Sequence, residues 1–189
     1  MNNDFILAAR QDAINWAKDL IKRNPAEWII LDTETTGLNS NDEIIQIGII
    51  DGAGNALIDN QLIKPACEIS NGAFAVNGIS AEMVKDAPNF GDVIPQIVEA
   101  VKGKHLVIYN AAYDLRMLIQ SDKSFQMNID EVACGIICAM NKYAQFVGEW
   151  NDYRGSFRWQ KLPSGDHSAI GDCRATLKLI NLMADQDTP

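Results

Sequence analysis

Three strand-like segments near the start of the chain constrain its fold most strongly. They are "EWIILDTE" (27–34), "EIIQIGIID" (43–51) and "ALIDNQLIKP" (56–65), and the turn "GAGN" (52–55) separates the last two. Runs rich in β-branched residues with turn residues between them favour an antiparallel meander. The first run is unusual, because its apolar residues lead straight into two acids, Asp32 and Glu34.

Helical and strand-like segments alternate after this meander. Apolar residues recur at helical spacing in five segments of the chain: 5–23, about 90–102, 113–121, 130–146 and 168–184. "HLVIYN" (105–110) indicates another strand, Ser80 is expected to cap a short helix, and residues 148–166 are expected to form an aromatic-rich loop. The order predicts an α/β fold in which one mixed sheet is flanked by helices. We expect a single globular domain, with a helical extension at 1–25 and the main body at 26–189.

The charge balance limits the kinds of partner that the chain can bind. Its 189 residues include 25 acids and 16 bases, which gives a formal charge of −9. This balance argues against gripping long nucleic acid by charge alone, whereas clustered acids can bind divalent cations. The four cysteines and two histidines do not form a zinc pattern. No apolar run approaches the roughly 18 residues of a membrane span, and the start lacks a signal peptide, so we expect a cytoplasmic protein without a membrane partner.

Acids also occupy the boundaries of other predicted elements. Asp32 and Glu34 share one face of a strand, where either a solvated rim or a divalent cation would relieve their repulsion. Asp114 opens a helix directly after a strand, and Asp172 lies early in the last helix, with His167 in the loop before it. Each residue alone has a structural explanation, such as an acid interacting with a helix dipole. Together, these residues could meet at one end of the sheet as a two-metal phosphoryl-transfer site.

Three motifs carry a resemblance to a known family. "DTETTGL" (32–38), "NAAYD" (110–114) and "HSAIGD" (167–172) resemble, in this order, the exonuclease motifs of the DnaQ-like, DEDDh branch of 3′–5′ exonucleases. The resemblance covers roughly residues 27–184 and is closest to stand-alone bacterial members. It implies a ribonuclease-H-like fold, in which parallel strands continue the three-stranded meander.

The resemblance also implies an activity. A metal-dependent 3′–5′ exonuclease would hydrolyse phosphodiester bonds from the 3′ end of single-stranded DNA and release nucleoside 5′-monophosphates. Trimming of short RNA is the alternative within this class. A catalytically silent nucleic-acid-binding or scaffold protein is the alternative of another class, although all five catalytic positions are filled. Whether the chain has a protein partner is left open by the sequence.

The resemblance further implies roles for individual residues. Asp32, Glu34 and Asp172 would hold one divalent cation, Asp32 would bridge to a second, and Asp114 would complete the second site through water. The two ions would be Mg²⁺, with Mn²⁺ able to substitute. His167 would act as the general base, for which an ordinary histidine pKa of about 6.5 is suited. The residues expected to contact the substrate are Thr35, Gly37, Leu38, Phe74, Asn110 and Tyr113.

Two departures from the family pattern concern how a substrate strand is held. "VNGIS" (76–80) has Asn77 where many relatives have histidine, and only "PSGD" separates Leu162 from His167, where many relatives have a longer insert. The segment "EWNDYRGSFRW" (149–159) mixes basic and aromatic residues in a way that suits a single strand. Its Trp159 could instead fill the core.

Overall fold

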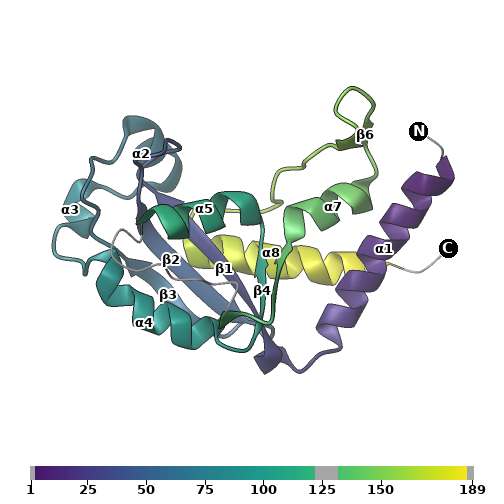
Figure 1. The fold of residues 1–189 in the computed structure, drawn as a ribbon, viewed down its shortest axis with the longest axis horizontal. Coiled ribbons are helices and arrows are strands. Elements are labelled where there is room, and N and C mark those ends of the chain that lie inside the picture. The colour runs from purple at the N-terminus through teal and green to yellow at the C-terminus, as the bar shows by residue number, and fades with distance from the viewer. Residues whose placement is uncertain (1–2, 122–131, 187–189) are drawn as a thin grey trace.

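The computed structural model describes residues 3–121 and 132–186, and its centre is a five-stranded sheet (Figure 1). The strands are β1 (Trp28–Thr35), β2 (Ile44–Asp51), β3 (Ala56–Leu62), β4 (His105–Ile108) and β5 (Gly135–Cys138). Their order is β3-β2-β1-β4-β5. β1, β2 and β3 pair antiparallel, while β4 is parallel to both β1 and β5. The predicted mixed sheet with an antiparallel meander is therefore confirmed.

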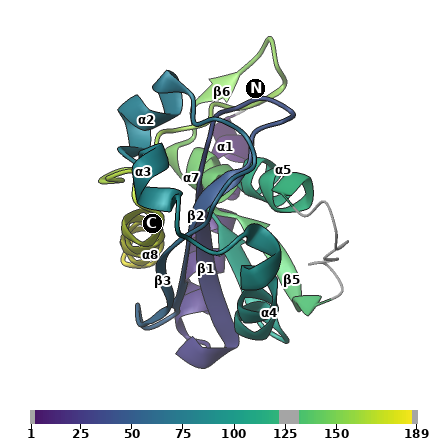
Figure 2. The same cartoon turned by 90° about the vertical axis from the view of Figure 1, so that its left-hand side faces the viewer.

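Helices cover both faces of this sheet (Figure 2). The longer ones are α1 (Asn3–Ile21), α4 (Phe90–Val101), α5 (Ala111–Ser121), α7 (Ala139–Val147) and α8 (Ala169–Ala184). Ile30 packs into the apolar cluster beneath α8, whereas Ile29 and Leu31 pack into the cluster formed with α4 and α5. This alternation follows from the two-residue period of a strand. The same alternation along β1 determines which face of the sheet Asp32 and Glu34 lie on.

The short elements connect these helices and strands along the chain. They are the 3₁₀ turn η1 (Pro25–Glu27), α2 (Asn71–Asn77), α3 (Ala81–Val84) and the hairpin strands β6 (Trp150–Asn151) and β7 (Ser156–Phe157). Ser80 caps α3 as expected, since its hydroxyl accepts a hydrogen bond from the Met83 backbone N–H. α1 packs on α7 and α8 through buried residues that include Ala13, Ala17 and Leu20. Among the described helices, none is long and apolar enough to cross a membrane.

The predicted helix over 130–146 is wrong in its central part. Residues 135–138 form strand β5, and α7 begins only at Ala139; residues 130–131 lie outside the described part. Ile136 and Ile137 pair in parallel register with Leu106 and Val107 of β4. An apolar run of four residues carries no reliable period of its own, so sheet pairing decided its structure. The predicted loop at 148–166 likewise contains a small hairpin, β6–β7.

Candidate active site

The end of β1 directs its two acids to one side of the sheet and Thr33 to the other. Asp32 and Glu34 alternate in phase with Ile30 and therefore face the α8 side. Thr33 faces the opposite side, where α5 begins. There, its hydroxyl and backbone N–H donate hydrogen bonds of 2.7 and 3.2 Å to one oxygen of Asp114. The sheet edge thus receives acids from a strand and from two helices.

Polar side chains of β2 and β3 fix the start of α8 close to this edge. The side-chain oxygen of Gln46 accepts a 3.0 Å hydrogen bond from the Ala169 N–H, and that of Asn60 accepts one of 2.9 Å from Ile170. Gly48 makes the approach possible, because a Cβ at this position would lie 2.7 Å from the backbone of Ala169 and Ile170. Two of the free N–H groups at the helix N-terminus are thereby satisfied by the sheet itself.

The loop before α8 is folded around two carboxylates. One oxygen of Asp172 accepts hydrogen bonds from the N–H groups of Asp166 (2.9 Å) and His167 (3.2 Å). Asp166 in turn accepts from the N–H and hydroxyl of Ser168. His167 has a left-handed backbone, with φ of 61°, which directs its ring away from the helix axis and leaves it exposed. The lack of a side chain at Gly171 leaves room for Asp166, whose carboxylate lies 1.9 Å from where a Cβ would be.

All five predicted catalytic residues meet at this edge of the sheet. Ligand atoms of Glu34, His167 and Asp172 lie within 4.8 Å of one another. Asp32 is close enough to Asp114, Asp172 and Glu34 for each to oppose its ionisation. Asp114 is only 3% exposed. The placement of His167 in the loop, which the spacing to Asp172 required, is confirmed.

Burial and mutual repulsion hold the pKa values of these acids high. Burial, followed by the charges of the neighbouring acids, raises the pKa of Asp32 well above its usual range. Burial and Asp172 raise the pKa of Glu34 to about 8, and burial raises that of Asp114 to about 7 despite its hydrogen bonds from Thr33. A divalent cation would remove both causes at once, because it supplies charge and coordination to carboxylate oxygens. This set of oxygen donors therefore fits a hard divalent metal ion.

A pocket of about 540 Å³ adjoins the acids on the side of α2. Its walls come from the end of β1, the following loop, α2 and α5. They comprise Thr33, Glu34, Thr35, Gly37, Leu38, Asn39, Ser70, Gly72, Ala73, Val76, Asn77 and Tyr113. This volume suits a small ligand such as a nucleotide.

Four of the six predicted substrate contacts line this pocket: Thr35, Gly37, Leu38 and Tyr113. Leu38 is 77% exposed at its rim, although the loop that carries it is fastened. The hydroxyls of Thr35 and Tyr113 lie 2.6 Å apart, and both are within hydrogen-bonding distance of the Gly37 carbonyl. An exposed leucine on a fixed loop offers an apolar surface against which a base could pack.

The other two predicted contacts lie outside the set of lining residues. Phe74 is half-exposed on α2. The carbonyl of Asn110 accepts hydrogen bonds from the N–H groups of Tyr113 and Asp114, and in this way Asn110 caps the start of α5. Phe74 was assigned as an aromatic residue that could stack on a base, and Asn110 was assigned from the motif; neither signal says which way a side chain turns.

Sequence reasoning missed the wall that α2 contributes. Ser70 caps this helix through its hydroxyl, and Gly78 ends it with φ of 70°, a start-and-stop pattern that is readable in "SNGAFAVNG". Asn77 joins the wall to the acids. Its amide nitrogen donates to the Thr35 carbonyl (3.2 Å), its oxygen accepts from the Ile79 N–H, and its side chain also hydrogen-bonds Glu34.

Comparisons with known proteins agree with this geometry. The profile of the exonuclease family named RNase_T matches residues 29–180. The exonuclease CP81 of Escherichia phage 186 is 34% identical over 189 residues, covering 92% of this chain and 93% of that protein. The DNA polymerase III epsilon subunit of Pasteurella multocida is 34% identical over 132 residues, or 65% of this chain. This chain spans about half of that subunit's length, since 51% of it is covered.

Solved structures extend the comparison to three dimensions. Exonuclease X, in complex with 5′ overhanging duplex DNA, superposes with a TM-score of 0.55 at 29% identity, covering 82% of this chain and 90% of that one. The nuclease domain of 3′hExo, a DEDDh family member bound to rAMP, superposes with a TM-score of 0.59. At 14% identity over 83% of this chain and 91% of that domain, it shows the fold alone. The motifs, the sheet and these relatives together show that the chain belongs to the DnaQ-like, DEDDh exonuclease family.

Proposed function

We propose that this exonuclease removes nucleotides one at a time from the 3′ end of single-stranded DNA and releases nucleoside 5′-monophosphates. The observation that carries the proposal is the convergence of four acids and one histidine beside a nucleotide-sized pocket. A pocket walled by the end of β1, α2 and α5 favours attack at a chain end, because it receives a terminal nucleotide more readily than the middle of a strand. Exonuclease X, which was solved with DNA, supports DNA over RNA as the substrate.

The residues of the site divide the work of hydrolysis. Asp32, Glu34 and Asp172 would hold one Mg²⁺, and Asp32 and Asp114 a second, with Mn²⁺ able to replace either. When bound, such ions act as Lewis acids on the scissile phosphate and its leaving oxygen. Water attacks phosphorus and gives up a proton, the bond from phosphorus to the 3′ oxygen breaks, and that oxygen takes a proton from the solvent to become the new 3′ hydroxyl.

His167 would accept the proton of the attacking water. Its exposed ring stands beside Glu34 and Asp172 but is carried by the loop rather than by the helix, so it can reach a water above the acids. The pocket would hold the terminal nucleotide, with Leu38 against its base and the Thr35–Tyr113 pair keeping the rim in place. Asn77 would orient Glu34 from α2.

End-labelled oligonucleotides test this function. Single-stranded DNA and RNA of one sequence, each labelled at the 5′ end, are incubated with the protein in Mg²⁺, Mn²⁺ or EDTA. We expect a ladder that shortens from the 3′ end, faster on DNA, with mononucleotide products and no reaction in EDTA. A 3′ phosphate should slow the attack. If the RNA were degraded faster than the DNA, RNA and not DNA would be the substrate. If neither were cleaved but the protein still bound the oligonucleotides, it would be a catalytically silent binding protein.

A further inference from the structure

An arm outside the active site combines basic and aromatic side chains. Residues 149–161, here called the hairpin arm, contain β6, β7 and the segment that leads toward α8. The arm has three bases against two acids, Glu149 and Asp152, and all three bases lie in its second part, from Arg154 to Lys161, in a chain whose formal charge is −9. Tyr153 is 98% exposed at its tip, and Trp159 is 68% exposed, so Trp159 does not fill the core.

The exposure of these rings is not a result of a loose segment, because the arm is anchored at its base. The rings of Trp150 and Phe157 meet edge to face at 5.1 Å, and Phe5 of α1 contacts both, at 5.5 and 5.9 Å. Beyond the hairpin, the Tyr109 hydroxyl donates a 2.9 Å hydrogen bond to the Gln160 carbonyl. α1 therefore braces one side of the arm, and the sheet holds its end.

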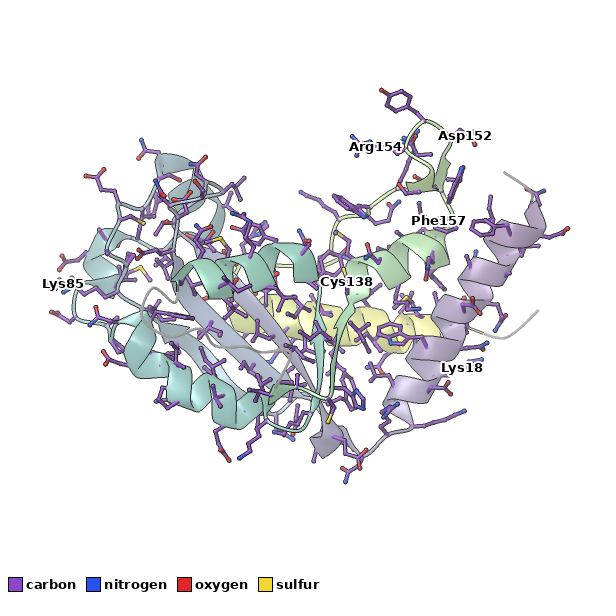
Figure 3. The ribbon with its side chains drawn as sticks, viewed as in Figure 1. Lys18, Lys85, Cys138, Asp152, Arg154 and Phe157 are labelled. Carbon is purple, nitrogen blue, oxygen red and sulfur yellow. The ribbon has the colours of Figure 1, made fainter. Side chains whose placement is uncertain are left out.

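The side chains of the arm point in two directions, toward α1 and away from it. Phe157 lies on the side toward α1, whereas Arg154 extends from the other side (Figure 3). Among the described residues, no ion pair is seen for Arg154, Arg158 or Lys161. Large exposed rings next to basic side chains on a fixed support are typical of a binding surface rather than of a solubilising one.

The arm leads directly to the active site. Phe157 and His167 are ten positions apart in the chain, which limits the distance between them to about 35 Å. The arm and α2, which forms a pocket wall, project to the same side of the molecule (Figure 1). On that side, α2 lies toward one end of the molecule and the hairpin toward the other (Figure 1), so a strand whose 3′ end occupies the pocket reaches the arm only if it is several nucleotides long.

We propose that the hairpin arm binds the part of a single DNA strand that lies 5′ of the bond being cut. Arg154, Arg158 and Lys161 contact phosphates, and Tyr153 and Trp159 stack on bases. The inference rests on the proposed function. A single strand fits better than a protein partner. Its phosphates alternate with flat nucleobases, and the arm offers basic side chains for the phosphates and aromatic rings for the nucleobases. The arm therefore sets the preference for long strands without taking part in the chemistry.

Steady-state kinetics on two substrate lengths test the proposal. The substrates are oligodeoxythymidylates of 20 and 3 nucleotides, and the variants are R154Q/R158Q and Y153A/W159A. The matched control is K22Q/K102Q, which removes two exposed bases outside the arm. Stacking contributes about 5- to 150-fold in affinity for each base. We therefore expect Y153A/W159A to raise KM for the 20-mer by about tenfold or more, with kcat and all kinetics on the trinucleotide unchanged.

The salt dependence of KM separates charge from stacking. A phosphate contact to a single strand contributes about 0.7 to the slope of log KM against log salt. R154Q/R158Q should lose about 1.4 of this slope, whereas Y153A/W159A and the control should keep it. An unchanged 20-mer KM in both arm variants would overturn the proposal and leave the arm to a protein partner. An equal rise in KM for the trinucleotide in the arm variants would also overturn the proposal. Failure of the proposed function is distinct, because the wild type would then degrade neither substrate.

Discussion

Replacing Glu34 by glutamine should have opposite effects on stability without and with metal. In the metal-free protein, burial and Asp172 raise the pKa of Glu34 from 4.5 to about 8. A difference of about 3.5 in pKa corresponds to a cost of about 5 kcal/mol when the carboxylate is charged at high pH. The remaining acids share this repulsion, so we expect Glu34→Gln to stabilise the metal-free protein at pH 8.5 by about 1–3 kcal/mol. That gain corresponds to roughly 2–12 °C in Tm for a chain of this size.

The sign of the pH dependence follows from the raised pKa. Because the folded protein keeps this proton to a higher pH than the unfolded chain does, the cost is absent below about pH 4.5 and complete above about pH 8. The Tm advantage of Glu34→Gln should therefore vanish on acidification. At saturating Mg²⁺ the order should reverse, because a ligand at 100 times its Kd adds about 2.7 kcal/mol to the form that binds it.

Differential scanning fluorimetry between pH 4.5 and 8.5, with EDTA or Mg²⁺, measures all of these effects. The control is Glu99→Gln, which removes an exposed acid of α4 and should shift neither series. If Glu34→Gln lowered the Tm of the metal-free protein at pH 8.5, or if Mg²⁺ stabilised both proteins equally, Glu34 would not belong to a repelling, metal-binding cluster.

Three further substitutions test individual parts of the site. Asp32→Ala should abolish turnover and weaken metal binding measured by calorimetry, yet leave the circular dichroism spectrum unchanged; wild-type turnover would refute its bridging role. His167→Ala should slow hydrolysis by about 10²–10⁴-fold and remove a histidine step from the pH–rate profile, while Mg²⁺ and DNA affinities persist. Gly48→Ala should cost about 1–3 kcal/mol in denaturant unfolding and also lower kcat, because its Cβ would meet the backbone at Ala169. Gly91→Ala is the control for Gly48→Ala, since a Cβ there meets nothing within 4 Å, and an equal cost for both would contradict the packing argument.

The acids were predictable because their positions in sequence follow directly from strand and helix periods. Asp32 and Glu34 had to share a face of β1, and Asp114 had to open α5. The meeting of Asp172 with these acids was suggested by its position at the start of a helix and by the motif order, but neither shows how the helix is held there. What brings it there is the anchoring of α8 by Gln46 and Asn60, and such contacts, more than 100 residues apart in sequence, leave no local pattern.

The missed features had weaker or misleading local signals. β5 was hidden because Ile136 also fits the helical period of the following α7, and only pairing with β4 distinguishes the two. The wall formed by α2 was overlooked because its small and polar residues indicated a connection. Trp159 could be assigned to core or surface only once Tyr109 was seen to hold the backbone next to it. For β5, a tertiary contact decided between two locally acceptable structures, whereas for α2 the local capping signals were present and were passed over.

Anomalous diffraction from crystals soaked with Mn²⁺ and a nucleoside 5′-monophosphate tests the two-metal site most directly. We predict two peaks roughly 3.5–4 Å apart. One should lie among Asp32, Glu34 and Asp172, and the other between Asp32 and Asp114, with His167 bonded to neither. The cluster of Glu34, His167 and Asp172, whose ligand atoms lie within 4.8 Å, offers the competing arrangement. A single peak bonded to the His167 ring would contradict both the two-metal site and the role of His167 as general base.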